Sequence, residues 1–504
     1  MFVNFLLAAA SALLLIFAFP SFDIAVLAPF ALAPLLVALS RARRHRERFL
    51  LGWVAGIVYW AGVCYWIEFV LAHHAGMAAW AAWLGFAVFC LIKALHLGVF
   101  ALAAGVLIAR RWALLAVPAL WVAIESTHTE LGFAWLTLGN AGVDMAMPAR
   151  LAPWTGVYGI SFVFAMIATA LVLLALRRPR VELVPLAALL LLGALPRLPD
   201  PQRGDERAVL VQPNVSETAE WTPDWVDRMH DRMLALTLRA TMQAPDPPRL
   251  IVWPEAPLPL YYYEDPDFRE QVNGLARRTG AYLIVNVTPH TPAGAPLNSA
   301  LLISPEGRPV GRYDKMNLVP FGEFVPRPFK ALVEKVSSEG GDFAAGERQV
   351  VLPAGRHRIG AFVCYESVFP NFVRRFADLG ADLYVNISND GWYGKTAARD
   401  QHLKIVRMRA AESRRWILRA TNDGITATID PAGRAYRDLP PYTEAATGTA
   451  YSYVKDVTFY SRFGDWFVWV CGVVAVMGLA EAAVARRVAR VLMSREHPPG
   501  IPAR

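Results

Sequence analysis

Eight apolar segments, each long enough to cross or nearly cross a lipid bilayer, constrain the fold of this chain more than any other feature. Seven of them precede residue 198 and the eighth follows residue 464. They lie at about 2–20, 23–40, 50–71, 77–108, 112–126, 157–176, 181–195 and 465–485. Because a membrane-spanning helix needs roughly 20 apolar residues, the sequence predicts a multi-pass α-helical membrane bundle of about eight helices.

The charges of the short loops predict how this bundle is oriented. Arginines cluster after the second, fourth, sixth and eighth segments, whereas the alternate short loops contain between them one basic residue, Arg150. Loops rich in basic residues remain in the cytoplasm. We therefore expect both termini in the cytoplasm and residues 198–464 on the periplasmic side of a bacterial inner membrane. This placement of arginines accounts for the net charge of +8, and nucleic-acid binding is not expected.

The polar region between the seventh and eighth segments has a different pattern. Strand-like runs such as Ala208–Gln212 and Leu250–Trp253 alternate with helical segments such as Pro223–Gln243. This alternation predicts an α/β layered domain with its functional residues at strand ends. We expect three parts, which are membrane helices in residues 1–197, a catalytic domain in 198–464, and a last membrane helix with a cytoplasmic tail in 465–504.

Three strand ends in the polar region carry residues suited to acyl transfer. Glu255 follows an apolar strand, Lys315 follows a second strand, and Cys364 is the cysteine that lies outside the apolar runs. A cysteine nucleophile needs a base, and the developing oxyanion needs a positive group. Each residue alone is compatible with a plain structural role, so the combination carries the hypothesis. The cysteine spacings fit neither a zinc site nor a disulfide framework, and no metal or cofactor is expected.

Four motifs in this region together resemble the nitrilase superfamily. They are WPE at 253–255, RYDK at 312–315, CYE at 364–366 and SNDGWYG at 388–394. With seven helices before them and one after, the whole chain resembles the apolipoprotein N-acyltransferase family. The resemblance implies an αββα sandwich with a catalytic triad, in which Glu255 is the general base, Lys315 stabilises the oxyanion and Cys364 is the nucleophile.

The same resemblance implies a set of supporting residues. They are Glu323, Tyr365 and Glu366 near the triad, with Trp221 and Asn298 as substrate-binding or supporting positions. One departure is KTAARDQH after residue 394, where the family often has small residues and a proline; it affects the expected shape of this loop and not the triad. The arginine-rich segment Lys404–Arg419 is interpreted as a salt-bridged structural helix in preference to a lipid headgroup site.

The implied activity is ping-pong acyl transfer by a monomer. The donor would be a membrane phospholipid, phosphatidylethanolamine in the family, and the acceptor the N-terminal α-amine of a diacylglyceryl-cysteine apolipoprotein. Two alternatives stay open, a membrane-tethered nitrilase-type amidase that hydrolyses a small amide, and a non-catalytic scaffold in which the sulfur is merely buried. For the charged or titratable residues within apolar segments, functional and structural pairing are equally open. These residues are Glu68, Lys93, His96 and Glu125.

Overall fold

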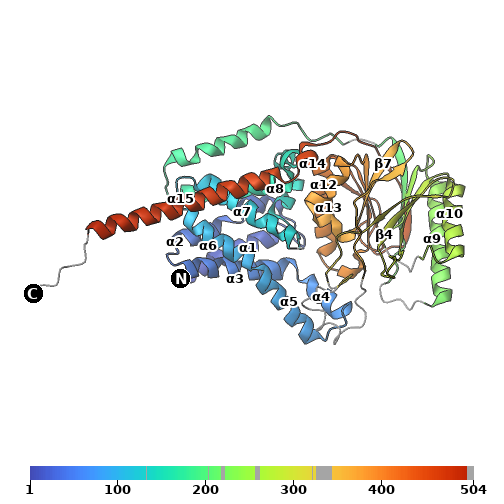
Figure 1. The fold of residues 1–504 in the computed structure, drawn as a ribbon, viewed down its shortest axis with the longest axis horizontal. Coiled ribbons are helices and arrows are strands. Elements are labelled where there is room, and N and C mark those ends of the chain that lie inside the picture. The colour runs from blue at the N-terminus through green and yellow to red at the C-terminus, as the bar shows by residue number, and fades with distance from the viewer. Residues whose placement is uncertain are drawn as a thin grey trace, which may run out of the picture.

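A bundle of helices and a pair of β-sheets lie side by side in this protein (Figure 1). The computed structural model describes residues 1–131, 133–201, 204–216, 222–255, 261–320, 322–324 and 343–496. The chain begins in the bundle, passes through the sheets, and returns along the bundle in α15 (Trp466–Glu496). The apolar and the polar regions of the sequence therefore fold into separate parts of the molecule.

The helices of the bundle follow the apolar segments. In chain order they are α1 (Phe2–Phe17), η1 (Ala25–Phe30), α2 (Ala33–Arg41), α3 (His45–Val63), α4 (Trp66–His73), α5 (Ala79–Lys93), α6 (Leu95–Leu107), α7 (Ala113–Glu130), η2 (Leu138–Asp144), η3 (Pro148–Leu151), α8 (Ala152–Ala175) and η4 (Arg180–Gly193). Helix α3 approaches α6 so closely that a Cβ atom at Gly52 would lie 2.2 Å from the carbonyl oxygen of Leu97. Small residues at helix contacts are typical of membrane bundles, where they let backbones approach each other.

Not every predicted membrane segment forms one long helix. Among the described residues, three helices are long and apolar enough to span a bilayer, Ala79–Leu107, Pro148–Ala175 and Trp466–Val488. A fourth is counted if α3 and α4, which are bent by 61°, act as one span. The seventh predicted segment forms the 3-10 helix η4, in which Pro185 lacks a backbone N–H donor. The structure supports a membrane-type bundle, and the count of eight spans stays a prediction.

The polar region forms two six-stranded sheets. The first has the order β12-β1-β2-β3-β4-β5 and the second the order β11-β10-β9-β8-β7-β6. The strands of the first are β1 (Glu206–Gln212), β2 (Leu250–Val252), β3 (Tyr282–Val287), β4 (Ser299–Ile303), β5 (Pro309–Asp314) and β12 (Ala445–Tyr451). Those of the second are β6 (Leu352–Ala354), β7 (His357–Val363), β8 (Leu383–Ser388), β9 (Ile417–Thr421), β10 (Ala427–Ile429) and β11 (Ala435–Arg437). In each sheet three neighbouring strands are parallel, β1 to β3 and β7 to β9.

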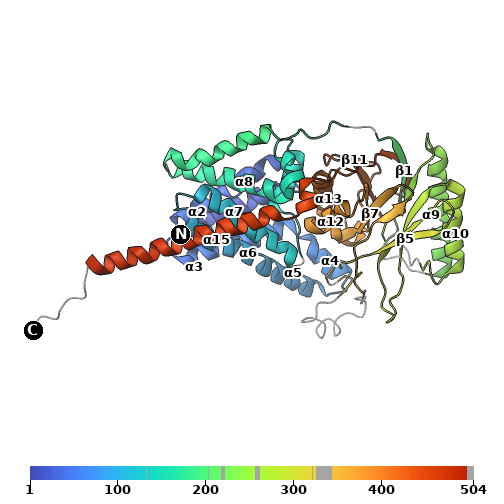
Figure 2. The ribbon, with the colours of Figure 1, turned by 45° about the horizontal axis from the view of Figure 1, so that its top comes forward.

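Alternating side chains of the first sheet divide the core into two layers. Val209 and Ile251 pack against the helices on the outer face, whereas their neighbours Leu210 and Val252 belong to the cluster shared with the second sheet. The four covering helices are α9 (Pro223–Gln243), α10 (Pro266–Thr279), α12 (Pro370–Asp378) and α13 (Ala398–Ser413). Helices α9 and α10 are outermost, and α12 and α13 lie between the second sheet and the bundle (Figure 2). This is an αββα sandwich, which confirms the predicted architecture of the polar region.

Helix α13 joins the sandwich to the bundle through ion pairs. Lys404 Nζ lies 2.5 Å from Asp144 Oδ2, and Arg407 Nη2 lies 2.6 Å from Oδ1 of the same carboxylate. Arg409 Nε lies 2.8 Å from Glu412 Oε2, one turn further along the helix. These cations are therefore engaged within the protein, which confirms the predicted salt bridges. The predicted helix is too long, because α13 ends at Ser413 and Arg419 lies in β9.

Candidate active site

Glu255, Lys315 and Cys364 extend from three strand ends into one buried region. Glu255 lies after β2, Lys315 directly follows β5, and Cys364 directly follows β7. Lys315 Nζ lies 3.1 Å from Glu255 Oε1. None of the three residues is more than 5% exposed. The structure thus brings the three predicted triad residues together between the sheets, where their charges act on one another.

Burial and the neighbouring charges together shift the pKa of the Cys364 thiol. Burial raises the pKa of this thiol above its ordinary value, and the charge of Glu255 raises it further, whereas Lys315 acts in the opposite direction. Burial alone would lower the pKa of Lys315, but the carboxylates of Glu255 and Glu323 outweigh it and hold that pKa above its ordinary value. The resting site therefore holds a neutral thiol beside a charged ammonium group.

Glu323 and Asn298 complete a hydrogen-bonded ring around Lys315. A carboxylate oxygen of Glu323 lies 2.9 Å from Lys315 Nζ. Asn298 Nδ2 donates to Oε1 of both Glu255 and Glu323, each at 2.8 Å, while its Oδ1 accepts from Asn286 Nδ2 at 2.8 Å. These partners fix the orientation of the Asn298 amide. Asn298 therefore holds the two carboxylates in place beside the lysine.

Glu366 ties the turn after Cys364 to the loop after Lys315. Its Oε1 accepts hydrogen bonds from the Tyr313 hydroxyl at 2.6 Å and from the Met316 backbone N–H at 2.8 Å. Its Oε2 accepts from the backbone N–H of the residue before Cys364, at 2.8 Å. Burial raises the pKa of Glu366 to about 7. The carboxyl group thus fixes the relative positions of two loops that carry triad residues.

The two remaining predicted positions, Tyr365 and Trp221, are both aromatic residues. Tyr365 is buried, and its ring meets that of Phe369 edge-on at a centroid distance of 5.3 Å. Trp221 lies outside the described residues, so its contact with substrate stays a prediction. Tyr365 therefore packs within the turn that begins at Cys364.

A buried charged network supports the same turn and was not expected from the sequence. Cys364 has a φ of 49°, a conformation that is costly for a residue other than glycine. His402 Nε2 lies 3.2 Å from the Cys364 carbonyl oxygen and 2.8 Å from Ser367 Oγ, and its Nδ1 lies 3.1 Å from Asp390 Oδ1. Arg419 Nη2 lies 2.7 Å from Asp390 Oδ2. The available signal was the SNDGWYG motif, which contains Asp390, whereas no local pattern surrounds His402.

Replacing Arg419 with methionine is expected to destabilise the fold by about 3–5 kcal/mol, because Asp390 would be left buried without its partner. Burial alone would raise the pKa of Asp390, but Arg419 and His402 hold it well below its ordinary value. A lowered pKa contributes stability that is present above the unfolded-state pKa and is lost as the pH falls. The difference in the free energy of unfolding between wild type and variant should therefore become smaller below about pH 4. Denaturation of the detergent-solubilised protein at several pH values measures it.

Arg437 provides a matched control for this substitution. Its guanidinium pairs with Asp400 at 2.7 Å, and the two side chains are 57% and 44% exposed. Exposed ion pairs contribute little, so Arg437→Met is expected to change the free energy of unfolding by less than about 1 kcal/mol. An Arg419→Met protein as stable as the control would contradict the structural role of the network.

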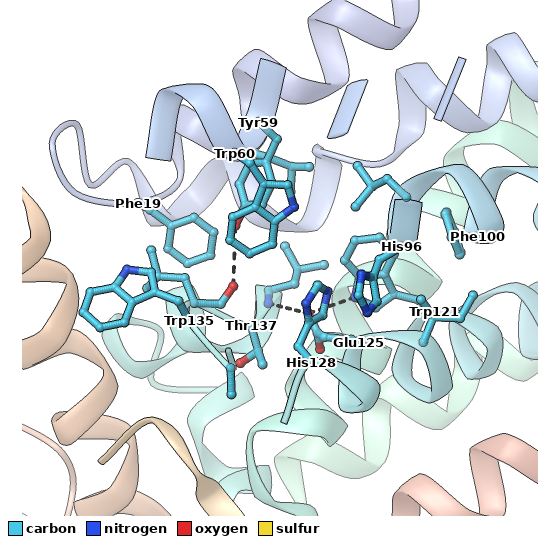
Figure 3. A pocket seen from close by; sticks show the side chains of 16 residues that line it. Phe19, Tyr59, Trp60, His96, Phe100, Trp121, Glu125, His128, Trp135 and Thr137 are labelled. Atoms are coloured by element: carbon cyan, nitrogen blue, oxygen red, sulfur yellow. Dashed lines mark hydrogen bonds between the residues drawn. The ribbon is translucent and has the colours of Figure 1, made fainter. Parts of the chain in front are cut away.

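The bundle contains a further polar cluster, of which His96, Glu125 and His128 line a cavity (Figure 3). Glu125 Oε1 accepts a hydrogen bond from Trp121 Nε1 at 3.2 Å. The ammonium group of Lys93 contacts His128 Nδ1, and the ring of His96 stacks on that of His128 at a centroid distance of 3.9 Å. Lys93, His96 and Glu125 thus have partners inside the bundle, as both the functional and the structural alternative require.

A cysteine, a lysine and a glutamate at the strand ends of an αββα sandwich, joined to an apolar helical bundle, define a membrane-associated enzyme with a nitrilase-like domain. Residues 208–455 match the carbon-nitrogen hydrolase family, and residues 11–170 match the apolipoprotein N-acyltransferase N-terminal domain. The chain belongs to the apolipoprotein N-acyltransferase family.

The relatives that support this assignment match nearly the whole chain. The apolipoprotein N-acyltransferase of Geobacter metallireducens is 34% identical over 505 residues, which cover 95% of each protein. That of Azotobacter vinelandii is 33% identical and covers 96% of each. Among solved structures, a mutant of the Nesterenkonia AN1 amidase from the nitrilase superfamily is similar with a TM-score of 0.38 and 20% identity, over 54% of this chain and 97% of that one.

Proposed function

We propose that this protein transfers a fatty acyl chain from a membrane phospholipid, through a thioester on Cys364, to the N-terminal α-amine of diacylglyceryl-cysteine apolipoproteins. The observation that carries the proposal is the buried arrangement of Glu255, Lys315 and Cys364 in a sandwich joined to an apolar bundle. A soluble substrate would not require such a bundle. Two lipid substrates require a site that is held at the bilayer surface.

In the first half of the reaction, Glu255 takes the thiol proton as Cys364 Sγ attacks the ester carbonyl carbon of the phospholipid. Lys315 donates a hydrogen bond to the oxyanion that develops on the carbonyl oxygen. When the tetrahedral intermediate collapses, the ester C–O bond breaks and the leaving oxygen takes the proton from Glu255. The products are a thioacyl-enzyme and a lysophospholipid.

In the second half, the free α-amine of the lipoprotein attacks the thioester carbonyl carbon. Lys315 again stabilises the oxyanion, and Glu255 accepts the proton that the amine loses. The C–S bond then breaks, and Cys364 recovers its proton from Glu255. The enzyme returns to its starting state, and the acceptor carries a third acyl chain through an amide bond.

The proposal includes a membrane topology. Eight spanning helices in residues 1–197 and 465–504 would place residues 198–464 in the periplasm and both termini in the cytoplasm, as the loop arginines favour. The donor would be phosphatidylethanolamine and the enzyme a monomer. This arrangement puts the thiol on the side of the membrane where exported lipoproteins lie.

The function is tested by intact mass spectrometry of the purified protein with phosphatidylethanolamine vesicles. We expect a mass gain of one acyl chain that hydroxylamine removes. Addition of a diacylglyceryl-cysteine peptide should discharge the chain onto the peptide, while the same peptide with an acetylated α-amine should leave the enzyme charged. Discharge by the acetylated peptide would contradict transfer to the amine.

The alternative of a membrane-tethered amidase makes the opposite prediction in the same experiment. An amidase would hydrolyse small soluble amides and gain no acyl chain from any phospholipid. Both activities need the same thiol, so mutation of Cys364 would abolish either one. The two alternatives are therefore distinguished by which substrate the wild-type protein uses.

A further inference from the structure

Two consecutive residues of α13 connect the membrane bundle to the nucleophile. Gln401 contacts the bundle, and His402 contacts the turn that begins at Cys364. Both side chains are fully buried. We propose that Gln401 is a positioning residue, which sets the place of Cys364 relative to the bundle and so to the ester of a membrane lipid. The proposal rests on the acyl-transfer function proposed above.

The carboxamide of Gln401 uses all of its hydrogen-bonding capacity on the bundle. Nε2 donates to the carbonyl oxygens of Pro20 at 2.7 Å and Val63 at 3.0 Å. Oε1 accepts from the indole N–H groups of Trp66 at 3.3 Å and Trp135 at 2.7 Å. Two acceptors must face the amide nitrogen and two donors the oxygen, so the orientation of the group is unambiguous.

The partners of Gln401 belong to separate parts of the bundle. Val63 ends α3 and Trp66 begins α4, so the amide bonds to both sides of the 61° bend between these helices. Pro20 follows α1, and Trp135 follows α7. Trp135 also lies at one end of the side chains that line the bundle cavity (Figure 3). One side chain of the sandwich therefore fixes four segments of the bundle to α13.

His402, the next residue of α13, links this helix to the residue that bears the thiol. Its Nε2 lies 3.2 Å from the Cys364 carbonyl oxygen, and its Nδ1 is anchored on Asp390. Because Gln401 and His402 share one helix backbone, a shift of α13 against the bundle moves the nucleophile by the same step. Gln401 touches none of the reacting atoms, so its loss should change where the thiol lies relative to the lipid and not how reactive the thiol is.

The test compares two reactions of the same sulfur in the full-length protein. Gln401→Met keeps the length of the side chain and removes all four hydrogen bonds. Thioester formation from phosphatidylethanolamine vesicles is followed by intact mass spectrometry. Alkylation by iodoacetamide, a small soluble reagent, is followed by mass spectrometry of the peptide that contains Cys364, because Cys64, Cys90 and Cys471 are also free thiols. We expect thioester formation to fall at least about tenfold, as the loss of one or more buried hydrogen bonds allows, and alkylation to stay within about twofold.

Gln212 supplies a matched control. It is also fully buried, and its Nε2 donates to the Pro440 and Thr443 carbonyl oxygens at 2.8 and 2.9 Å, within the sandwich. Gln212→Met should lower thermal stability while the ratio of the two reaction rates stays at the wild-type value. Should Gln401→Met fail to fold, Trp135→Phe removes only one of the four bonds and should lower the same ratio by a smaller factor.

Three outcomes decide whether Gln401 positions Cys364. A selective loss of thioester formation supports positioning by Gln401. An equal loss of both reactions would mean that Gln401 acts only through stability, and unchanged thioester formation would mean that it has no role, so either result overturns the proposal. A wild-type protein that is alkylated but never acylated would overturn the acyl-transfer function itself, and that result is recognised without any variant.

Discussion

Cys364→Ala is expected to abolish acyl transfer and leave the fold intact. The substitution removes the sulfur that forms the thioester, and no water or hydroxyl group replaces a covalent nucleophile efficiently. We expect the rate of lipopeptide acylation to fall by at least about 10⁴-fold, in line with the loss of nucleophiles in other covalent enzymes. Intact mass spectrometry with phosphatidylethanolamine should show no acyl gain, and thermal denaturation should show a change of no more than about 2 kcal/mol.

Cys471 serves as the control for this change. It lies in α15, is 2% exposed, and is a free thiol like Cys364. Cys471→Ala loses a buried sulfur of the same kind and should acylate at the wild-type rate. Residual acylation of the Cys364→Ala protein near the wild-type rate would remove the Cys364 thioester from the mechanism.

The sequence predicted the parts of the site that depend on local pattern. Short apolar strands with polar residues at their ends placed Glu255, Lys315 and Cys364 at the edges of a layered domain, and resemblance to a family assigned their roles. The structure places all three at strand ends and pairs Lys315 with Glu255. Glu323 and Asn298 were assigned by resemblance, and their contacts with Lys315 and Glu255 were not foreseen.

The parts that could not be predicted depend on contacts between residues far apart in the chain. Gln401 and Pro20 are separated by 381 residues, so no local pattern predicts their hydrogen bond. No motif surrounds His402, yet it contacts the backbone of Cys364 from α13. The bend between α3 and α4 was also not predicted, because the apolar run at 50–71 continues through it. Hydropathy measures how apolar a segment is and not its direction.

Glu255→Gln is expected to change two properties of Cys364 in opposite directions. In the proposed mechanism Glu255 accepts the thiol proton, and an amide does not, so acyl transfer should fall by about 10²–10⁴-fold. The charge of Glu255 also raises the pKa of the thiol, next to the larger effect of burial. Removing that charge lowers the pKa, so the thiolate fraction at neutral pH increases. Alkylation by iodoacetamide should therefore become faster, and its pH profile should move to lower pH.

The hydrogen bonds of Glu255 show why it is informative that acyl transfer becomes slower while alkylation becomes faster. Its oxygens accept from Lys315 Nζ at 3.1 Å, Asn298 Nδ2 at 2.8 Å and the Asn389 backbone N–H at 3.0 Å. All three neighbours are donors, so a glutamine must turn its NH₂ group toward one of them, and some local distortion is expected. Distortion alone would slow both reactions of the thiol. A slower acyl transfer with a faster alkylation can arise only if the lost carboxylate both raised the thiol pKa and accepted its proton, whereas a parallel loss would assign Glu255 a structural role.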